Sequence, residues 1–215
     1  DLHSFPTRRS SDLYSWLLAL GVAIYFTVLW LSTPDADPSD ALRRALFHAV
    51  SMQTSSGFFT DDFTHWPGAL PVILMLTTFI GGCAGSTSGG MKVVRWLLLW
   101  KQGQREVVQL VHPSAEVPVK LGAKAIDPRI VDAVWGFFGV YIVAFSALIV
   151  LLIAIGEDQV TAFSAIAACM NNTGTGLGEV ASNFATLSDP GKWICLVAML
   201  DRKSTRLNSS HLFIS

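Results

Sequence analysis

The chain contains 215 residues, of which 51% are hydrophobic and only 14% are charged, and its formal net charge is -1. Soluble domains carry about 25% charged residues, so this composition argues against a soluble enzyme and indicates a membrane protein. A net charge near zero also argues against a nucleic-acid-binding protein, which is normally strongly basic. The three cysteines, Cys83, Cys169 and Cys195, lie in apolar stretches without CxxC spacing, which is typical of buried hydrophobic residues rather than of a disulfide framework or a zinc site.

The two ends of the chain differ from the rest in composition. Residues 1–13 and 201–215 are polar and basic, and the change after Leu200 is abrupt. A membrane span needs about 20 apolar residues, and the apolar segment that begins at Trp193 stops well short of that length. We interpret both ends as adapter or vector sequence and leave them out of the fold prediction; a genuine cytoplasmic tail is the alternative for the C-terminal end.

The first apolar segment, Tyr14–Leu31, has 18 residues without a charge, which is enough for a minimal membrane span. Ser39 or Asp40 can then cap a short helix that runs from Ala41 to about Gln53. This helix is too short to cross a membrane, and it leads directly into a polar strip, Thr54–Phe58.

A second apolar segment follows and is interrupted part-way. It covers Pro67–Ile80, breaks at the small and flexible residues of Gly81–Gly90, and resumes as Met91–Trp100. Residues 101–127 then form the one long hydrophilic stretch of the chain.

The second half of the chain repeats this order. A strong span covers Ile130–Ile155, a short apolar helix covers Thr161–Met170, and a second polar strip, Asn171–Gly176, precedes the start of a last helix. Gly57 and Gly174 are 117 residues apart in the two strips. The series of span, short helix, glycine-containing strip and span indicates an internal repeat.

The charges predict which side of the membrane each loop faces. The loops next to the glycine strips are mainly acidic: Asp35, Asp37, Asp40, Asp61, Asp62, Glu157, Asp158, Glu179 and Asp189. The opposite side is mainly basic: Lys92, Arg95, Lys101, Arg105, Lys120, Lys124 and Arg129. Because cytoplasmic loops carry the excess of Lys and Arg, residues 101–127 are predicted to be cytoplasmic and the glycine strips to face outward.

Irregular backbone at membrane depth is tolerated only where protein buries it or where it lines a water-filled cavity. Carbonyl oxygens turned towards an axis can replace the hydration shell of a cation, and Gly57 and Gly174 would supply the backbone torsions that such a strip needs. The C-terminal ends of the short helices would add partial negative charge. An ordinary turn after a surface helix is the alternative, but two copies between spans favour a pore.

The glycine-rich segment Gly81–Gly90 has two interpretations, a mobile constriction below the strips or a kink that allows close helix packing. As a mobile constriction, we expect its Gly, Ala and Ser residues to make few packing contacts, so that it opens at little cost in free energy. Its pattern does not fit a nucleotide-binding P-loop, since Lys92 follows Met91 rather than Gly. It also lacks a GxSxG elbow, because Thr87 occupies the central position.

Five motifs in this chain resemble the C-terminal half of the potassium-uptake subunits of the TrkH/TrkG/KtrB superfamily: HAVSMQTSSGF, FIGGCAGSTSGGMKVVR, VHP, AVWGFF and NNTGTGLGEV. The resemblance covers about Tyr14 to Leu200. It implies an all-α membrane protein in which four repeats of helix, pore helix, filter and helix surround one pore. This chain would supply two tandem repeats, the third over 14–100 and a truncated fourth over 128–200, joined by a cytoplasmic linker at 101–127.

The resemblance also implies roles for individual residues. The potassium-binding filter would consist of Thr54, Ser55, Ser56 and Gly57 together with Asn171, Asn172, Thr173 and Gly174. The intramembrane gating loop would be Gly81, Gly82, Cys83, Ala84, Gly85, Ser86, Thr87, Ser88, Gly89 and Gly90. Two departures are Thr175, where relatives often have proline, and Ser55-Ser56, where threonine is frequent. The basic residue of the family's last helix would lie after Leu200, where this sequence becomes polar and basic.

By the same resemblance we expect a multi-pass protein of the bacterial inner membrane that takes up potassium, with potassium as substrate, no covalently bound cofactor and no enzymatic activity. The expected partners are a cytoplasmic nucleotide-binding regulatory subunit of the TrkA/KtrA type, a second copy of the full-length subunit and membrane lipid, but not nucleic acid. A secondary cation symporter with re-entrant hairpins is the alternative, although few charges lie inside the spans. A membrane-embedded hydrolase would need a catalytic dyad, which we do not find. We further expect the two strips to approach each other with their carbonyls inward.

Overall fold

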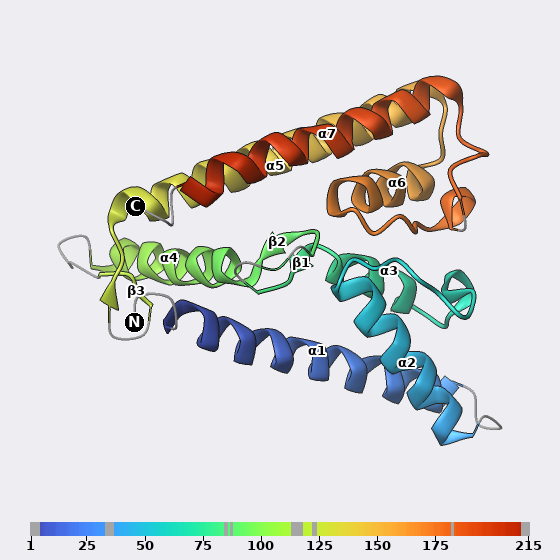
Figure 1. The fold of residues 1–215 in the computed structure, drawn as a ribbon, viewed down its shortest axis with the longest axis horizontal. Helices are drawn as coiled ribbons and strands as arrows, with labels where there is room; N and C mark the ends of the chain where they lie inside the picture. The colour runs from blue at the N-terminus through green and yellow to red at the C-terminus, as the bar shows by residue number, and fades with distance from the viewer. Residues whose placement is uncertain are drawn as a thin grey trace.

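The structure is a computed structural model that describes residues 5–32, 37–83, 86, 88–112, 118–121, 124–181 and 183–211. Four long helices run along its longest axis (Figure 1): α1 Phe5–Ser32, α4 Val93–Val111, α5 Pro128–Ile155 and α7 Asp189–His211. The shorter elements gather towards one end: α2 Pro38–Gln53, the 3-10 turn η1 Phe63–His65, α3 Leu70–Thr77, α6 Gln159–Asn171 and the 3-10 turn η2 Gly178–Val180.

The two halves of the chain enter this end in the same way. Helices α1 and α5 both run from the left of Figure 1 to the right, and the short helices α2 and α6 then turn back into the molecule. The glycine strips that follow α2 and α6 therefore lie on the same side of the structure. This parallel placement agrees with the charge pattern, which predicted that both strips face one side.

The fold is mostly helical, as predicted, but it also contains two short strand pairs that were not predicted. Strand β1 (Ile80–Gly81) pairs in parallel with β2 (Met91–Lys92), and β3 (Lys120–Leu121) pairs antiparallel with β4 (Lys124–Ala125). The β1–β2 pair brings the two ends of the glycine-rich segment side by side. Backbone groups that leave a helix inside a membrane protein need new partners, and this ladder supplies them.

Several helix boundaries differ from the predicted ones. Helix α1 begins at Phe5 and α7 ends at His211, so both continue into the segments that we interpret as adapter sequence. Residues 1–4 and 212–215 lie outside the described residues, and the adapter interpretation stays a prediction. Helix α4 runs on to Val111 through the first part of the predicted hydrophilic linker. It does so as an amphipathic helix, because Leu98 and Leu99 are buried while Gln104 and Glu106 are exposed.

The predicted cap of the first short helix is wrong by a few residues. We expected Ser39 or Asp40, but α2 begins at Pro38 with Asp37 at the N-cap position. Proline is favoured in the first turn because its missing N–H would have no partner there. The Asp37 side chain makes no capping hydrogen bond, whereas Asp158, at the same position of α6, accepts one from the Val160 amide.

This difference leads to a stability prediction. Asp158→Ala should lower the free energy of unfolding by about 1 kcal/mol, because it removes the capping acceptor of α6. Asp37→Ala is the matched control and should have little effect, since no capping bond is lost. Thermal unfolding of the two variants in detergent measures the difference, and equal losses would contradict it.

The short helices pack through small side chains. Ala41, Ala45 and Ala49 recur every four residues on one face of α2 and share a buried cluster with Tyr25 and Leu29 of α1. Helix α6 is buried along most of its length among α5, α7 and the first half of the chain. Its small buried residues are Thr161, Ala162, Ser164, Ala165, Ala167, Ala168 and Cys169. Such residues allow helix backbones to approach closely without a large water-excluding core.

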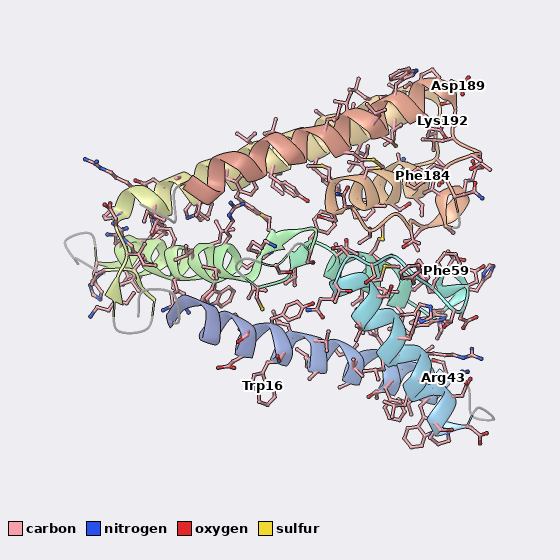
Figure 2. The ribbon with its side chains drawn as sticks, viewed as in Figure 1. Trp16, Arg43, Phe59, Phe184, Asp189 and Lys192 are labelled. Atoms are coloured by element: carbon pink, nitrogen blue, oxygen red, sulfur yellow. The ribbon has the colours of Figure 1, made fainter. Side chains whose placement is uncertain are left out.

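Among the described residues, two helices are by length and composition able to cross a membrane, Ser11–Ser32 and Pro128–Ile155. Only 11% of the most apolar stretch of the first helix and 6% of that of the second are buried, so these are not the core helices of a soluble fold. Large side chains such as Trp16, Val140 and Val143 are exposed instead. Figure 2 shows Trp16 pointing away from the other helices. The exposed apolar faces fit a lipid environment or contact with further membrane helices.

Candidate functional site

The first glycine strip leaves α2 through a defined backbone motif. The Ser56 amide donates to the Ser51 carbonyl at 2.9 Å, and the Ser55 amide donates to the Met52 carbonyl at 3.1 Å. These two crossed bonds form a Schellman motif, in which the residue after the helix adopts a left-handed conformation. Ser55 has a φ of 59°, and Gly57 follows with a φ of 72°.

The second strip leaves α6 in the same way. The Thr173 amide donates to the Ala168 carbonyl at 3.0 Å, and the Asn172 amide donates to the Cys169 carbonyl at 3.3 Å. Asn172 has a φ of 52°, and Gly174 has a φ of 82°.

The two exits therefore correspond residue by residue. Ser55 and Asn172 are the non-glycine residues with positive φ in the described part of the chain, and both occupy the left-handed position. Gly57 and Gly174 follow two residues later in each strip, where positive φ favours glycine. The internal repeat predicted from the 117-residue spacing thus extends to backbone conformation.

The strips meet at Gly57, as we expected. A Cβ on Gly57 would overlap the Thr173 carbonyl oxygen and lie 2.9 Å from the carbonyl carbon. The backbone of the first strip therefore packs directly on the backbone of the second. At this contact the Thr173 oxygen faces Gly57, and the predicted inward orientation of the carbonyls as a set stays a prediction.

The first residue of each predicted filter strand has a helical backbone conformation. Thr54 is the right-handed C-cap of α2, and Asn171 is the last residue of α6. The Thr54 hydroxyl donates to the Val50 carbonyl at 2.7 Å, a back-bond typical of threonine in a last helical turn. The irregular parts of the strips therefore begin at Ser55 and Asn172, one residue later than predicted.

The glycine-rich segment docks on both helix ends. The Gly89 amide donates to Ser55 Oγ at 2.9 Å, and the Ser88 hydroxyl donates to the Gln53 carbonyl at 3.3 Å. A Cβ on Gly89 would overlap the Asn171 carbonyl oxygen. The end of this segment thus contacts the exit of α2 and the exit of α6 together.

The ends of the segment are tightly packed, and our expectation of few packing contacts is wrong for them. A Cβ on Gly81 would lie 2.9 Å from the Gly90 carbonyl carbon, and one on Gly90, whose φ is 52°, would lie 2.8 Å from the Gly81 amide nitrogen. The parallel β1–β2 pair causes this closeness, because it brings the two ends side by side. Within the predicted gating loop, Ala84, Gly85 and Thr87 lie outside the described residues.

The other described residues of the segment lie between these ends. Gly82 is buried and Cys83 is half-buried. The Lys92 ammonium donates to the Ser86 carbonyl and, at 3.3 Å, to the Ser88 carbonyl. Lys92 therefore holds the backbone of the segment from the start of α4.

Two side chains that contact this site were not identified from the sequence. Thr78 accepts a hydrogen bond from Asn171 Nδ2 at 3.0 Å, and the Tyr141 hydroxyl donates to Asn171 Oδ1 at 3.1 Å. The Asn171 side chain is therefore directed between α3 and α5. The signal available in the sequence was that Thr78 and Tyr141 place a hydroxyl inside an apolar segment. This signal does not indicate that Asn171 is their hydrogen-bond partner.

The two acidic side chains near the strips, Asp61 and Asp62, are each bound by neighbouring residues. Asp61 forms an ion pair with Arg44 at 2.9 Å. Hydrogen bonds from the Thr64 hydroxyl and amide hold the pKa of Asp62 below its ordinary value. These contacts are those of an ordinary solvated loop.

A family model described as TrkH, a cation transport protein, matches residues 19–210. The chain belongs to the TrkH family. The resemblance seen in the sequence motifs is therefore confirmed, and the predominantly helical fold agrees with it.

Relatives named Trk system potassium uptake protein TrkH match this family member closely. The protein of Vibrio parahaemolyticus is 53% identical over 163 residues, covering 76% of this chain and 34% of that protein. The protein of Halomonas elongata is 48% identical over 198 residues, covering 92% of this chain and 41% of that protein. The crystal structure of the potassium transporter TrkH from Vibrio parahaemolyticus superimposes with a TM-score of 0.82 at 47% identity, over 91% of this chain and 41% of that one. This chain thus spans well under half the length of the relatives it matches.

Proposed function

We propose that this chain supplies two pore-lining repeats of a potassium uptake transporter of the bacterial inner membrane, with potassium as the transported substrate. The observation that carries the proposal is the pair of equivalent exits from α2 and α6, which place two left-handed glycine strips in direct backbone contact at Gly57. The names of the relatives, potassium uptake proteins, support the choice of cation.

In this proposal the ion is held by backbone carbonyls of the strips. The residues are Thr54, Ser55, Ser56 and Gly57 with Asn171, Asn172, Thr173 and Gly174, through their main chains. Carbonyl oxygens can replace the hydration shell of potassium, and two further repeats would complete the ring. Helices α2 and α6 both end at the strips, so the negative ends of their dipoles would favour a cation there.

The glycine-rich segment would act as the gate. Its ends are anchored by the β1–β2 pair and by the Gly89–Ser55 hydrogen bond, so movement would be confined to the residues between these anchors. Lys92 connects the segment to α4, which extends towards the basic side of the molecule. We propose that a cytoplasmic nucleotide-binding regulatory subunit moves α4, and that two full-length subunits assemble in the lipid membrane.

The test of this function uses a full-length TrkH-family transporter that carries this chain's residues at the matching positions. Expression should restore growth of a potassium-uptake-deficient bacterium at low potassium, and reconstituted protein should pass potassium in preference to sodium. Absence of potassium flux from well-folded protein would refute the proposal. Obligatory proton or sodium movement with each potassium ion would favour the symporter alternative.

A deletion tests the gate. Removing residues 85–87 leaves the anchors at Ser88 and Gly89 in place, and it should raise potassium flux in the absence of the regulatory subunit, because the path below the strips would no longer be closed. Flux is measured in proteoliposomes, with the same transporter carrying the intact segment as control. Unchanged or lower flux from folded protein would contradict the gating role and favour a packing kink.

A further inference from the structure

Asn171 is the centre of a buried polar cluster formed by three elements. Its side chain is fully buried at the end of α6, and Thr78, just after α3, is 1% exposed. The Asn171 amide donates to Thr78 Oγ1 at 3.0 Å and accepts from the hydroxyl of Tyr141, on α5, at 3.1 Å. Both ends of the Asn171 amide group are therefore satisfied by residues distant in sequence.

The direction of these bonds is determined by the neighbours. The Thr78 hydroxyl gives its own proton to the Met75 carbonyl at 2.7 Å, so its oxygen is left to accept from Asn171 Nδ2. The other side of the amide, Oδ1, then faces the donating hydroxyl of Tyr141. The cluster has one consistent arrangement, which holds the last residue of α6 in a single orientation.

The same residue contacts the glycine-rich segment near its exit and Thr78 just before its entry. Its side chain contacts Thr78, which directly precedes the Phe79–Gly81 entry, and its main-chain carbonyl packs on Gly89, near the exit. The next residue, Asn172, takes the left-handed conformation that starts the second strip. Asn171 thus contacts the glycine-rich segment and directly precedes Asn172, where the irregular part of the second strip begins.

We infer that Thr78 and Tyr141 are positioning residues for ion selectivity: they hold the Asn171 side chain so that the second strip and the glycine-rich segment keep one relative position. The inference rests on the proposed function and adds to it two residues outside the strips and outside the segment. Loss of either hydroxyl leaves part of a buried amide without its partner and frees the end of α6 to shift. The strip carbonyls would then move relative to the ion, although no ion ligand has been changed.

The experiment compares four single variants, and the double variant Thr78→Val/Tyr141→Phe, in the full-length transporter described above. Thr78→Val removes the acceptor with little change of shape, and Tyr141→Phe removes only a hydroxyl. Thr78→Ser keeps the acceptor and serves as the conservative variant. Thr77→Val is the matched control, because Thr77 makes the same kind of back-bond, to Leu74 at 2.7 Å, next to Thr78 in the chain.

The readouts are the potassium-to-sodium flux ratio in proteoliposomes and the thermal stability of the purified protein. Thr78→Val and Tyr141→Phe should each lower the flux ratio roughly threefold or more, the size expected for a hydrogen bond between membrane helices. The double variant should show less than the combined effect, since both changes release the same side chain. Thr78→Ser and Thr77→Val should keep the parent ratio.

Failure of this inference can be told apart from failure of the proposed function. If the parent protein carries potassium selectively but Thr78→Val and Tyr141→Phe keep its flux ratio, the positioning role is overturned. An equal fall in Thr77→Val would also overturn it, because the effect would then be general destabilisation. If Thr78→Val does not fold, Tyr141→Phe decides the question alone, because the Tyr141 side chain is only half-buried.

Discussion

Replacing Gly57 with alanine is expected to abolish selective potassium transport by the full-length transporter. The residue has a φ of 72°, in a region that costs an L-residue roughly 1–2 kcal/mol. The added Cβ would also overlap the Thr173 carbonyl oxygen and lie 2.9 Å from its carbon. The two strips must then separate, and the ion site between them is lost. Serine at this position should act in the same way.

Variants of two other glycines separate the effect of backbone strain from the effect of steric overlap. Gly68 has a φ of 63°, but no atom of the described residues lies within 4 Å of the position that a Cβ would take, so Gly68→Ala adds backbone strain alone. Gly103 has neither feature, and Gly103→Ala should leave transport unchanged. Potassium and sodium fluxes and the thermal stability of the three variants are compared. A Gly57→Ala protein with parental selectivity would show that the residue is only a turn.

Replacing Gly89 with alanine is expected to raise potassium flux in the absence of the regulatory subunit, by roughly tenfold, as overpacking of a close contact costs about 1–3 kcal/mol. A Cβ on Gly89 would overlap the Asn171 carbonyl oxygen and lie 2.5 Å from Ser55 Oγ. Gly89 has no positive φ, so the effect would arise from steric displacement of the segment and not from backbone strain. Flux of the purified variant in proteoliposomes measures it.

Ser55→Ala provides the comparison for this variant. It removes the acceptor of the Gly89 amide without adding an atom, so the segment loses one anchor while the close packing remains. Ser55→Ala should also raise potassium flux in the absence of the regulatory subunit, but by less than Gly89→Ala. Parental flux in Gly89→Ala, with the protein intact in the membrane, would show that docking of the segment does not control permeation.

Both predictions concern carbonyls at the end of α6. Gly57 packs on Thr173 from the first strip, and Gly89 packs on Asn171 from the glycine-rich segment. The second strip is therefore held between the other two parts of the site. A change on either side is expected to alter the position of the same few carbonyl oxygens.

The features determined by the sequence alone are local or periodic. Apolar length predicted Tyr14–Leu31 and Ile130–Ile155 as candidate spans, because crossing a membrane requires a minimum helix length. The 117-residue spacing of Gly57 and Gly174 indicated the repeat, because positive φ favours glycine wherever the chain leaves a helix in this way. The glycine-rich motif identified the family. Each of these signals lies within a short stretch of chain.

Tertiary structure alone decided where the side chains around the strips point. Asn171 is predicted to bind the ion in a filter strand, but no pattern in the sequence showed that its side chain bonds to Thr78, 93 residues earlier in the chain. The glycine-rich segment was expected to be loosely packed, yet its ends pair as β1 and β2 and dock on Ser55. These outcomes depend on which backbone and side-chain groups lose water together when distant segments pack, because a buried polar group takes whichever partner the fold brings within reach.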